Sequence, residues 1–404
     1  MKNPFFRRQV IEIQDDPALR IVGALLALAA LAHGIDVNHA GFVARLIDFL
    51  DPTCWFFWPQ CHLYRAPESW PLPFLIIGFQ VLSLCCALLF SWRSTTKAAW
   101  WILFFLTLCR HGVILLSFEN MGNYHYMSLI ATYVFLLLPQ KRMIYPLFLI
   151  AFYLAASALK FNNEWLSGAA LWKASIELPD ALIRVGCFYV VYLESVLVLL
   201  LLHPKAWVRW SIFIQLILFH AVSALWVGWF YPVTMILLLS IFPVSWLSIS
   251  TEKGLVWTDL ARMKKANIAA LAAFFAAQMV PWMMAGTSSL TGEGRLFSLN
   301  MFDSRNECQS LLQMRFHGEV MDVTNGERQS LAVRIRCDPM VVFSRIRNLC
   351  RSEMNNPDFL GMDVFVIAKR ASDPTYRPLL SLHDACRRKL DADLWGRHEG
   401  VERW

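Results

Sequence analysis

The sequence predicts an α-helical polytopic membrane protein of about nine spans with a small, β-rich extracytoplasmic domain at its C-terminus. Of its 404 residues, 57% are hydrophobic and 17% are charged, whereas soluble proteins carry about 25% charged residues. Apolar runs of about 20 residues, the length that crosses a bilayer core, recur up to residue 285. We therefore expect a transmembrane helical domain over residues 1–285 and an extracytoplasmic β-rich domain over residues 286–404.

Nine apolar runs give the expected spans, and Lys and Arg favour one side of them. The runs are residues 19–38, 73–92, 98–118, 124–139, 143–160, 182–203, 207–226, 228–249 and 267–285. Fourteen Lys and Arg residues lie on the side of the N-terminus, against only Arg45, Arg65, Lys160 and Lys173 on the other side. Positively charged loops stay in the cytoplasm. We therefore expect a multi-pass protein of the cell inner membrane, with a cytoplasmic N-terminus and a periplasmic or otherwise extracytoplasmic C-terminal domain.

The N-terminus and the first outer loop fit this topology. About 18 polar or amphipathic residues precede the first apolar run and no small-residue cleavage site follows it, so we expect a retained helix and not a cleaved signal. The outer loop at 39–70 contains Trp55-Phe56-Phe57-Trp58, which is typical of a re-entrant or interfacial segment.

The net charge of +7 belongs almost entirely to the membrane part of the chain. Residues 286–404 contain 17 Lys and Arg against 16 Asp and Glu, which leaves six of the seven positive charges before residue 286. A basic excess in such loops indicates membrane topology and lipid contact, and we expect no nucleic-acid partner. The sequence has no recognisable metal or nucleotide motif, so neither ligand is predicted.

The pattern changes after residue 286 to short alternating runs, which predict strands. Two such runs, residues 311–323 and 328–336, flank Thr324-Asn325-Gly326-Glu327. Asn-Gly favours a hairpin because both residues tolerate positive φ. Residues 363–367 predict a further strand.

The ten cysteines divide by location. Four lie within predicted spans, where we expect inert packing residues: Cys85, Cys86, Cys109 and Cys187. Six lie outside the membrane: Cys54, Cys61, Cys308, Cys337, Cys350 and Cys386. An even number in an oxidising compartment permits disulfides. The sequence leaves their pairing open, and it offers no Cys-x-x-Cys spacing for a metal site.

Ionisable residues inside spans are the candidate functional residues, because their burial in lipid is costly. They are Arg110, His111, His125, Lys160, Glu194 and His220. The predicted topology places His125 and Lys160 at similar depth near the outer interface. A partly desolvated Lys is a usable general base.

Structural roles compete with this interpretation. A Lys at the end of a span usually extends to the lipid headgroups, and an isolated intramembrane His usually makes an interhelical hydrogen bond. Arg110 and Glu194 could form an ion pair with each other inside the bundle.

Four motifs resemble those of the vitamin K-dependent γ-carboxylases and the wider horizontally transferred transmembrane-domain (HTTM) family. Residues 153–168 look like the family's lysine motif, with Lys160 at the catalytic-base position and Leu159 where the carboxylases usually have a first Lys. The other three are Asn123-Tyr124-His125-Tyr126, Phe219-His220 with Val227-Gly228-Trp229-Phe230-Tyr231-Pro232, and Phe302-Asp303-Ser304-Arg305. The last has Asp303 where the family has His, and the chain is shorter at its C-terminus than the animal enzymes.

The resemblance implies a lyase that couples oxidation of a reduced naphthoquinone of the vitamin K or menaquinol type by O₂, giving an epoxide, to carboxylation of glutamate side chains by CO₂. Lys160 would be the base, and His125 would orient it. His220 would hydrogen-bond a quinol or carbanion oxygen. Arg305 would bind the substrate carboxylate, with Asn123 and Arg110 as further substrate-binding residues. The implied partners are a glutamate-containing peptide or protein, quinol from the bilayer, and membrane lipids.

Three other functions fit the same sequence. The first is a quinol epoxidase or oxidoreductase without peptide carboxylation, which the short C-terminal domain and Asp303 favour. The second is a non-redox peptide-maturation or export factor with the same helical fold. The third is a transporter with Arg110, Glu194 and His220 along its path, against which the sequence shows no inverted repeat.

Overall fold

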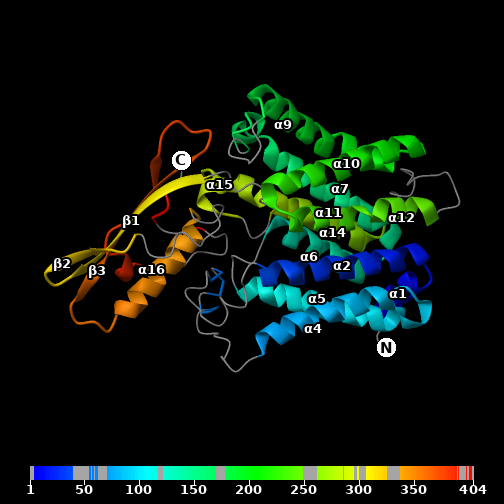
Figure 1. Cartoon of the computed structure of the whole chain (residues 1–404), viewed down its shortest axis with the longest axis horizontal. Coiled ribbons are helices and arrows are strands. Elements are labelled where there is room, and N and C mark those ends of the chain that lie inside the picture. Colours follow the sequence, from blue (N-terminus) through cyan, green and yellow to red (C-terminus); the bar gives the residue numbers. More distant parts are fainter. Residues whose placement is uncertain are drawn as a thin grey trace.

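The structure is a computed structural model of the whole chain, in which a helical bundle carries a small sheet at one end (Figure 1). The description covers residues 4–39, 54–55, 57–58, 60–61, 71–116, 122–169, 171, 178–248, 262–284, 286–294, 298–299, 306–324, 337–388, 390, 397 and 400–402.

Within these residues, seven helices are long and apolar enough to cross a membrane. They are α2 (Pro17–His39), α4 (Leu72–Leu89), α5 (Thr96–Leu116, preceded by η2, Arg93–Thr95), α7 (Lys141–Lys160), α9 (Asp180–Ser195, continued by η4, Leu197–Leu202), α10 (Ala206–Val227) and α14 (Lys265–Met279, continued by η5, Val280–Met283). All seven coincide with predicted spans.

The remaining two predicted spans coincide with shorter helices. Residues 124–139 form α6 (Asn123–Leu137), and residues 228–249 contain α11 (Phe230–Leu239) and α12 (Ile241–Ser248). At a rise of 1.5 Å per residue, the 15 residues of α6 cover about 22 Å, less than the ~30 Å of a bilayer core. The helix ends one residue before Leu138, whose extended conformation is the one that a following proline, here Pro139, favours.

The loops that the charge pattern places on the N-terminal side meet at one end of the bundle. The short helix α1 (Pro4–Gln14) lies at this end, opposite the sheet (Figure 1). Arg93, between α4 and α5, pairs with Asp15 at 2.6 Å. Gln140, between α6 and α7, donates a hydrogen bond to the carbonyl of Arg262 at 3.2 Å. The Gln140 amide also donates to the carboxylate of Glu12 on α1 at 3.2 Å, so three connections and the N-terminal segment are held together.

The most enclosed of the seven long helices is α7, in which 72% of an 18-residue apolar stretch is buried inside the bundle. Ala155, Ala156 and Ser157 are all buried on it. Small side chains let helices approach closely within a membrane. The Ser157 hydroxyl donates to the carbonyl of Val191 on α9 at 3.2 Å. This close packing puts the C-terminal turn of α7 against the second half of α9.

The C-terminal sheet has four antiparallel strands in the order β2-β1-β3-β4. The strands are β1 (Asn306–Phe316), β2 (Glu319–Asp322), β3 (Phe359–Arg370) and β4 (Arg377–Leu382), and the helical segments of this part are α15 (Ser288–Thr291), α16 (Pro339–Glu353) and η8 (Ala385–Arg387). Alternate residues of β1 and β3, among them Leu312 and Val364, are buried in one core with Phe343 and Ile346 of α16. The strand predicted at 363–367 is confirmed within β3.

The prediction of one continuous strand over residues 311–323 is wrong, because this run contains a hairpin. β1 and β2 turn back at His317-Gly318, and Gly318 has a φ of +90°. Glycine adopts such a φ without steric cost, and this two-residue connection suits a tight hairpin. The predicted turn at Asn325-Gly326 and the strand at 328–336 lie outside the described residues.

All six cysteines predicted outside the membrane form disulfides. The pairs are Cys54–Cys61, Cys308–Cys337 and Cys350–Cys386. The four cysteines predicted within spans are free. Three disulfides on one side of the bundle are typical of an oxidising compartment.

Candidate functional site

A buried ion pair joins α7 and α9 in the half of the bundle nearest the sheet. The Lys160 ammonium donates a hydrogen bond to Oε2 of Glu194. Both side chains are only 1% exposed. Lys160 therefore does not extend to the headgroups, and Glu194 does not pair with Arg110, so both of these structural predictions are wrong.

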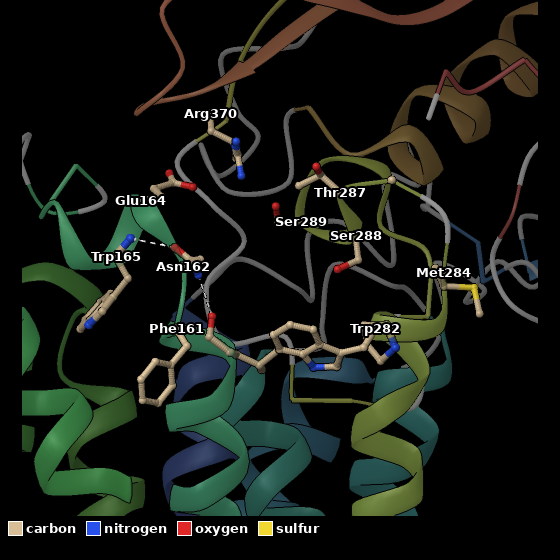
Figure 2. A pocket seen from close by; sticks show the side chains of 13 residues that line it. Phe161, Asn162, Glu164, Trp165, Trp282, Met284, Thr287, Ser288, Ser289 and Arg370 are labelled. Atoms are coloured by element: carbon tan, nitrogen blue, oxygen red, sulfur yellow. Dashed lines mark hydrogen bonds between the residues drawn. The ribbon is translucent and has the colours of Figure 1, made fainter. Parts of the chain in front are cut away.

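Two aromatic rings enclose the Lys160 ammonium. Its Nζ atom lies 5.4 Å from the centre of the Trp165 ring and 5.6 Å from that of Phe219. Trp165 belongs to the single-turn helix α8 (Asn163–Leu166). The Asn162 side chain caps this helix by accepting a hydrogen bond from the Trp165 amide at 2.8 Å (Figure 2). The turn after α7 thus folds back beside the ion pair.

His220 lies near the ion pair and is hydrogen-bonded to a tyrosine of α7. Its Nε2 atom is 2.6 Å from the Tyr153 hydroxyl, and the ring is fully buried. Tyr153 precedes Lys160 by two helical turns, which places both on the same face of α7. Tyr231, on α11, packs against His220 with ring centres 5.4 Å apart. Gly228, at a φ of +78°, follows the last residue of α10 and allows α11 to turn back toward His220.

Lys160, Glu194, His220 and Tyr153 form a first cluster of polar residues. Two of its atoms lack partners among the described residues. They are Oε1 of Glu194 and Nδ1 of His220. Buried polar atoms are nearly always hydrogen-bonded. Unpartnered atoms beside a buried ion pair therefore mark a place where a substrate group or a water molecule can bind.

His125 lies in a second cluster, which residues of α2, α5 and α6 form. Its ring stacks on that of His33, on α2, with centres 4.3 Å apart. Its Nε2 atom lies 3.2 Å from Oδ2 of Asp36. Asp36 also accepts a hydrogen bond from the Tyr124 hydroxyl. Asn123 is the first residue of α6, two positions before His125.

Arg110 completes the second cluster. Its Nε atom donates to Nδ1 of His33 at 2.9 Å, and its Nη2 atom donates to the Ser128 hydroxyl. His111, the next residue on α5, instead lies 3.1 Å from the Tyr133 hydroxyl. The structure thus brings Arg110 and His125 together through His33.

The two clusters approach each other through tyrosine side chains. Tyr124, which bonds to Asp36, and Tyr231, which packs against His220, have ring centres 6.2 Å apart. The predicted residues Lys160, His220, His125 and Arg110 therefore fall into two polar groups that lie side by side in the same half of the bundle.

His33, Asp36 and Tyr153 belong to these clusters, and the candidate residues chosen from the sequence did not include them. His33 and Asp36 are three positions apart on α2, so they lie on one face of that helix. This spacing within an apolar run was the available signal. Arg305 and Asp303 lie outside the described residues.

A cavity of about 260 Å³ lies between the end of the bundle and the sheet (Figure 2). Phe161, Trp165 and Trp282 form apolar parts of its wall, and Glu164, Ser288 and Arg370 are among its polar residues. Trp165 lines the cavity and also contacts Lys160. The residue Trp165 therefore borders both the cavity and the ion pair.

The charged residue that β3 contributes to the cavity is held in place by an acidic partner. Arg370 Nη2 donates to Oδ1 of Asp373 at 2.8 Å, and Nε donates to Oδ2 at 3.0 Å. These hydrogen bonds lower the pKa of the Asp373 carboxyl. They also raise the pKa of Arg370, to which the charges of Asp373 and Glu164 add. The guanidinium therefore stays protonated in the wall of the cavity.

Among the described residues, no three His, Cys, Asp or Glu side chains are grouped as metal ligands. Comparison of the chain with family models, curated proteins and solved structures found no match.

Proposed function

We propose that the chain is an integral membrane enzyme of the vitamin K-dependent γ-carboxylase type. In this proposal, oxidation of a reduced naphthoquinone by O₂ is coupled to carboxylation of glutamate side chains, and Lys160 is the base. The observation that carries the proposal is the burial of Lys160 against Glu194. The order of the four sequence motifs adds support.

A buried Lys–Glu pair can hold a single proton between an amine and a carboxylate. When Glu194 carries that proton, the Lys160 amine is neutral and can accept one from a hydroxyl group. The Oε1 atom of Glu194 has no partner among the described residues, so this carboxylate has a position at which to hold the proton. Glu194 would therefore share the role of base with Lys160.

The surroundings of the pair suit chemistry that water would quench. Trp165 and Phe219 flank the ammonium, and exclusion of water protects strongly basic species from protonation. His220 would offer its Nδ1 atom to a substrate oxygen while Tyr153 fixes its ring. The naphthoquinol supplies the oxidisable diol whose reaction with O₂ drives the coupled carboxylation.

The cavity beside Trp165 fits the head group of such a quinol. Its volume of about 260 Å³ is near the lower end of small-molecule sites, which is about 300 Å³. It therefore suits a bicyclic ring better than a folded peptide. Phe161 and Trp282, each 58% exposed at the end of a span, leave a route by which a prenyl chain could lie in lipid.

Replacement of Lys160 tests the base assignment. We expect Lys160→Met to lower epoxide formation by about 10²- to 10⁴-fold, the usual contribution of a general base. Mass spectrometry of a menaquinol analogue incubated with the purified protein in nanodiscs measures this. The matched control is Lys141→Met, because Lys141 is equally buried at the opposite end of α7 and bonds to Gln9. Equal epoxide yields from the Lys160 variant and wild type would refute the assignment.

Labelled CO₂ separates the proposed reaction from its alternatives. We expect label in a glutamate-containing peptide only when quinol and O₂ are both present. Epoxide without labelled peptide would identify a quinol epoxidase or oxidoreductase. Peptide modification that needs no quinol would identify a non-redox maturation factor.

A further inference from the structure

Tyr189 and Tyr192 of α9 and Gln215 of α10 are polar residues on the outer surface of the bundle. The two tyrosines are 44% and 50% exposed, and Gln215 is partly exposed. At a rise of 1.5 Å per residue, all three lie within about 3 Å of the middle of their spans. Because α9 and α10 form one edge of the bundle (Figure 1), this surface would face the centre of a bilayer.

Lipid tails offer these side chains no hydrogen bonds. The Tyr189 hydroxyl donates to Oε1 of Gln215, whose Nε2 atom donates to the Ser211 carbonyl at 3.1 Å. The Tyr192 hydroxyl has no hydrogen-bond partner among the described residues. Tyrosine is enriched at the membrane interfaces, which lie about 15 Å from the middle of a bilayer core. Polar side chains at this depth usually bond to another helix, so we expect a further helix on this surface.

The shape of the surface also suits a packed helix. Gly186 precedes Tyr189 by three residues, which places both on one face of α9. No atom lies within 4 Å of the position that a Cβ of Gly186 would occupy. Small residues at such positions let transmembrane helices approach closely. The neighbouring helix α10 is the least enclosed of the seven long helices, with 17% of an 18-residue apolar stretch buried.

A second copy of the chain complements this surface. Two copies with the same orientation in a membrane, related by a two-fold axis along the membrane normal, place each residue at the depth of its counterpart. The Tyr192 donor of one copy therefore lies at the depth of the Gln215 acceptor of the other. Near the outer end of α9, Asp180 and Arg184 are exposed and form no ion pair among the described residues. Their opposite charges, one turn apart, can pair between the copies.

We propose that the chain forms a two-fold homodimer through the exposed face of α9 and α10. The Tyr192 hydroxyl of each copy donates to a polar group of the other copy, and Gly186 lets the helices meet. The inference rests on the membrane insertion that the proposed function includes, but it requires neither quinol nor O₂. A dimer that makes no epoxide would refute the proposed reaction alone, and a monomer that makes epoxide would refute the dimer alone.

Step photobleaching of singly labelled chains in liposomes, at graded protein-to-lipid ratios, measures the dimer. We expect a dimer fraction that rises with protein density and saturates. Tyr192→Phe should weaken the dimer about three- to ten-fold, through loss of interhelical hydrogen bonds. Gly186→Leu should weaken it about ten-fold or more, because a larger side chain keeps the helices apart. Gly78→Leu is the control, because Gly78 is equally open but belongs to α4, at the opposite edge of the bundle (Figure 1).

Oxidative cross-linking locates the contact. In a chain whose free cysteines on α4 and α5 are replaced by serine, Val185→Cys should give a disulfide-linked dimer, because Val185 is exposed on α9. Val81→Cys, exposed on α4, should give none.

Three results would overturn the proposal. They are a chain that stays monomeric at every density, equal losses for Gly186→Leu and Gly78→Leu, and cross-linking through Val81→Cys alone. Flotation with the liposomes checks membrane insertion of each variant, and thermal unfolding in detergent checks its folding. Tyr192→Phe removes only a hydroxyl group from an exposed ring, so this variant tests the contact even if Gly186→Leu fails to fold.

Discussion

At the scale of single residues, the buried charges of Lys160 and Glu194 each depend on the other for electrostatic stabilisation inside the bundle. Removing one partner of a buried ion pair typically costs 3–5 kcal/mol, since the remaining charge is left uncompensated. We therefore expect Lys160→Met and Glu194→Leu each to lower stability by about this amount. The double variant should be more stable than either, because well-packed apolar side chains often replace a buried pair without loss.

A double-mutant cycle of thermal unfolding in one detergent measures this coupling. Lys141→Met serves again as the control, because Lys141 bonds to Gln9 and to the Leu138 carbonyl and lies far from Glu194 along α7. Additive losses for Lys160→Met and Glu194→Leu would show that the two charges act independently. A double variant that is stable but makes no epoxide would separate the catalytic role of the pair from its structural one.

The sequence predicted which residues carry charge into the membrane, but their partners were predicted poorly. Lys160 and His220 could be chosen because an ionisable residue in an apolar run is conspicuous. The partner of Glu194 depends on α9 packing against α7, and no local pattern encodes that neighbourhood. The similar depth and the family resemblance suggested that His125 orients Lys160, whereas the stacking of His125 on His33 depends on the lateral position of α2.

At the scale of helices and strands, the disulfide Cys350–Cys386 links α16 to the segment after β4. The bridge spans 36 residues, and closing a loop of this length in the unfolded chain contributes about 3–4 kcal/mol. We expect the pair Cys350→Ser and Cys386→Ser to make the C-terminal domain of the full-length protein more sensitive to protease. Proteolysis after a short pulse of denaturant measures the change.

Cys85→Ser is the control for this experiment, because Cys85 is a free cysteine on α4. Its removal should leave the protease resistance of the sheet unchanged. Equal resistance of the wild type and the double serine variant would show that packing of α16 on β1 and β3 holds the domain without the bridge.

Helices were predicted more completely than the sheet, for a physical reason. Within lipid, a span must satisfy its backbone hydrogen bonds internally, so a long apolar run fixes both the type and the position of an element. The alternation from residue 311 onward is compatible with one strand or with two. The turn at His317-Gly318 depends on a single glycine at φ +90°, which the more conspicuous Asn325-Gly326 obscured.

At the scale of the whole molecule, the N-terminal helix and the sheet lie at opposite ends of the bundle (Figure 1). The connection between α4 and α5 belongs to the first end, where Arg93 pairs with Asp15. His383 follows β4 at the second end, and its side chain is 76% exposed. The excess of positive charge at the first end predicts that it faces the cytoplasm.

Labelling of single introduced cysteines tests this orientation. In intact cells in which the outer face of the inner membrane is accessible, a membrane-impermeant maleimide should label His383→Cys and not Ser94→Cys. Inverted vesicles should show the reverse. The native cysteines interfere little, because six form disulfides, Cys86 and Cys187 are buried, and Cys85 and Cys109 lie within apolar helices that a membrane-impermeant reagent does not enter. Labelling of both positions from one side would place the two ends in one compartment and overturn the nine-span topology. Labelling of Ser94→Cys alone in intact cells would show that the orientation is the reverse of the predicted one. The first cluster, which contains Lys160, would then lie in the cytoplasmic half of the bilayer.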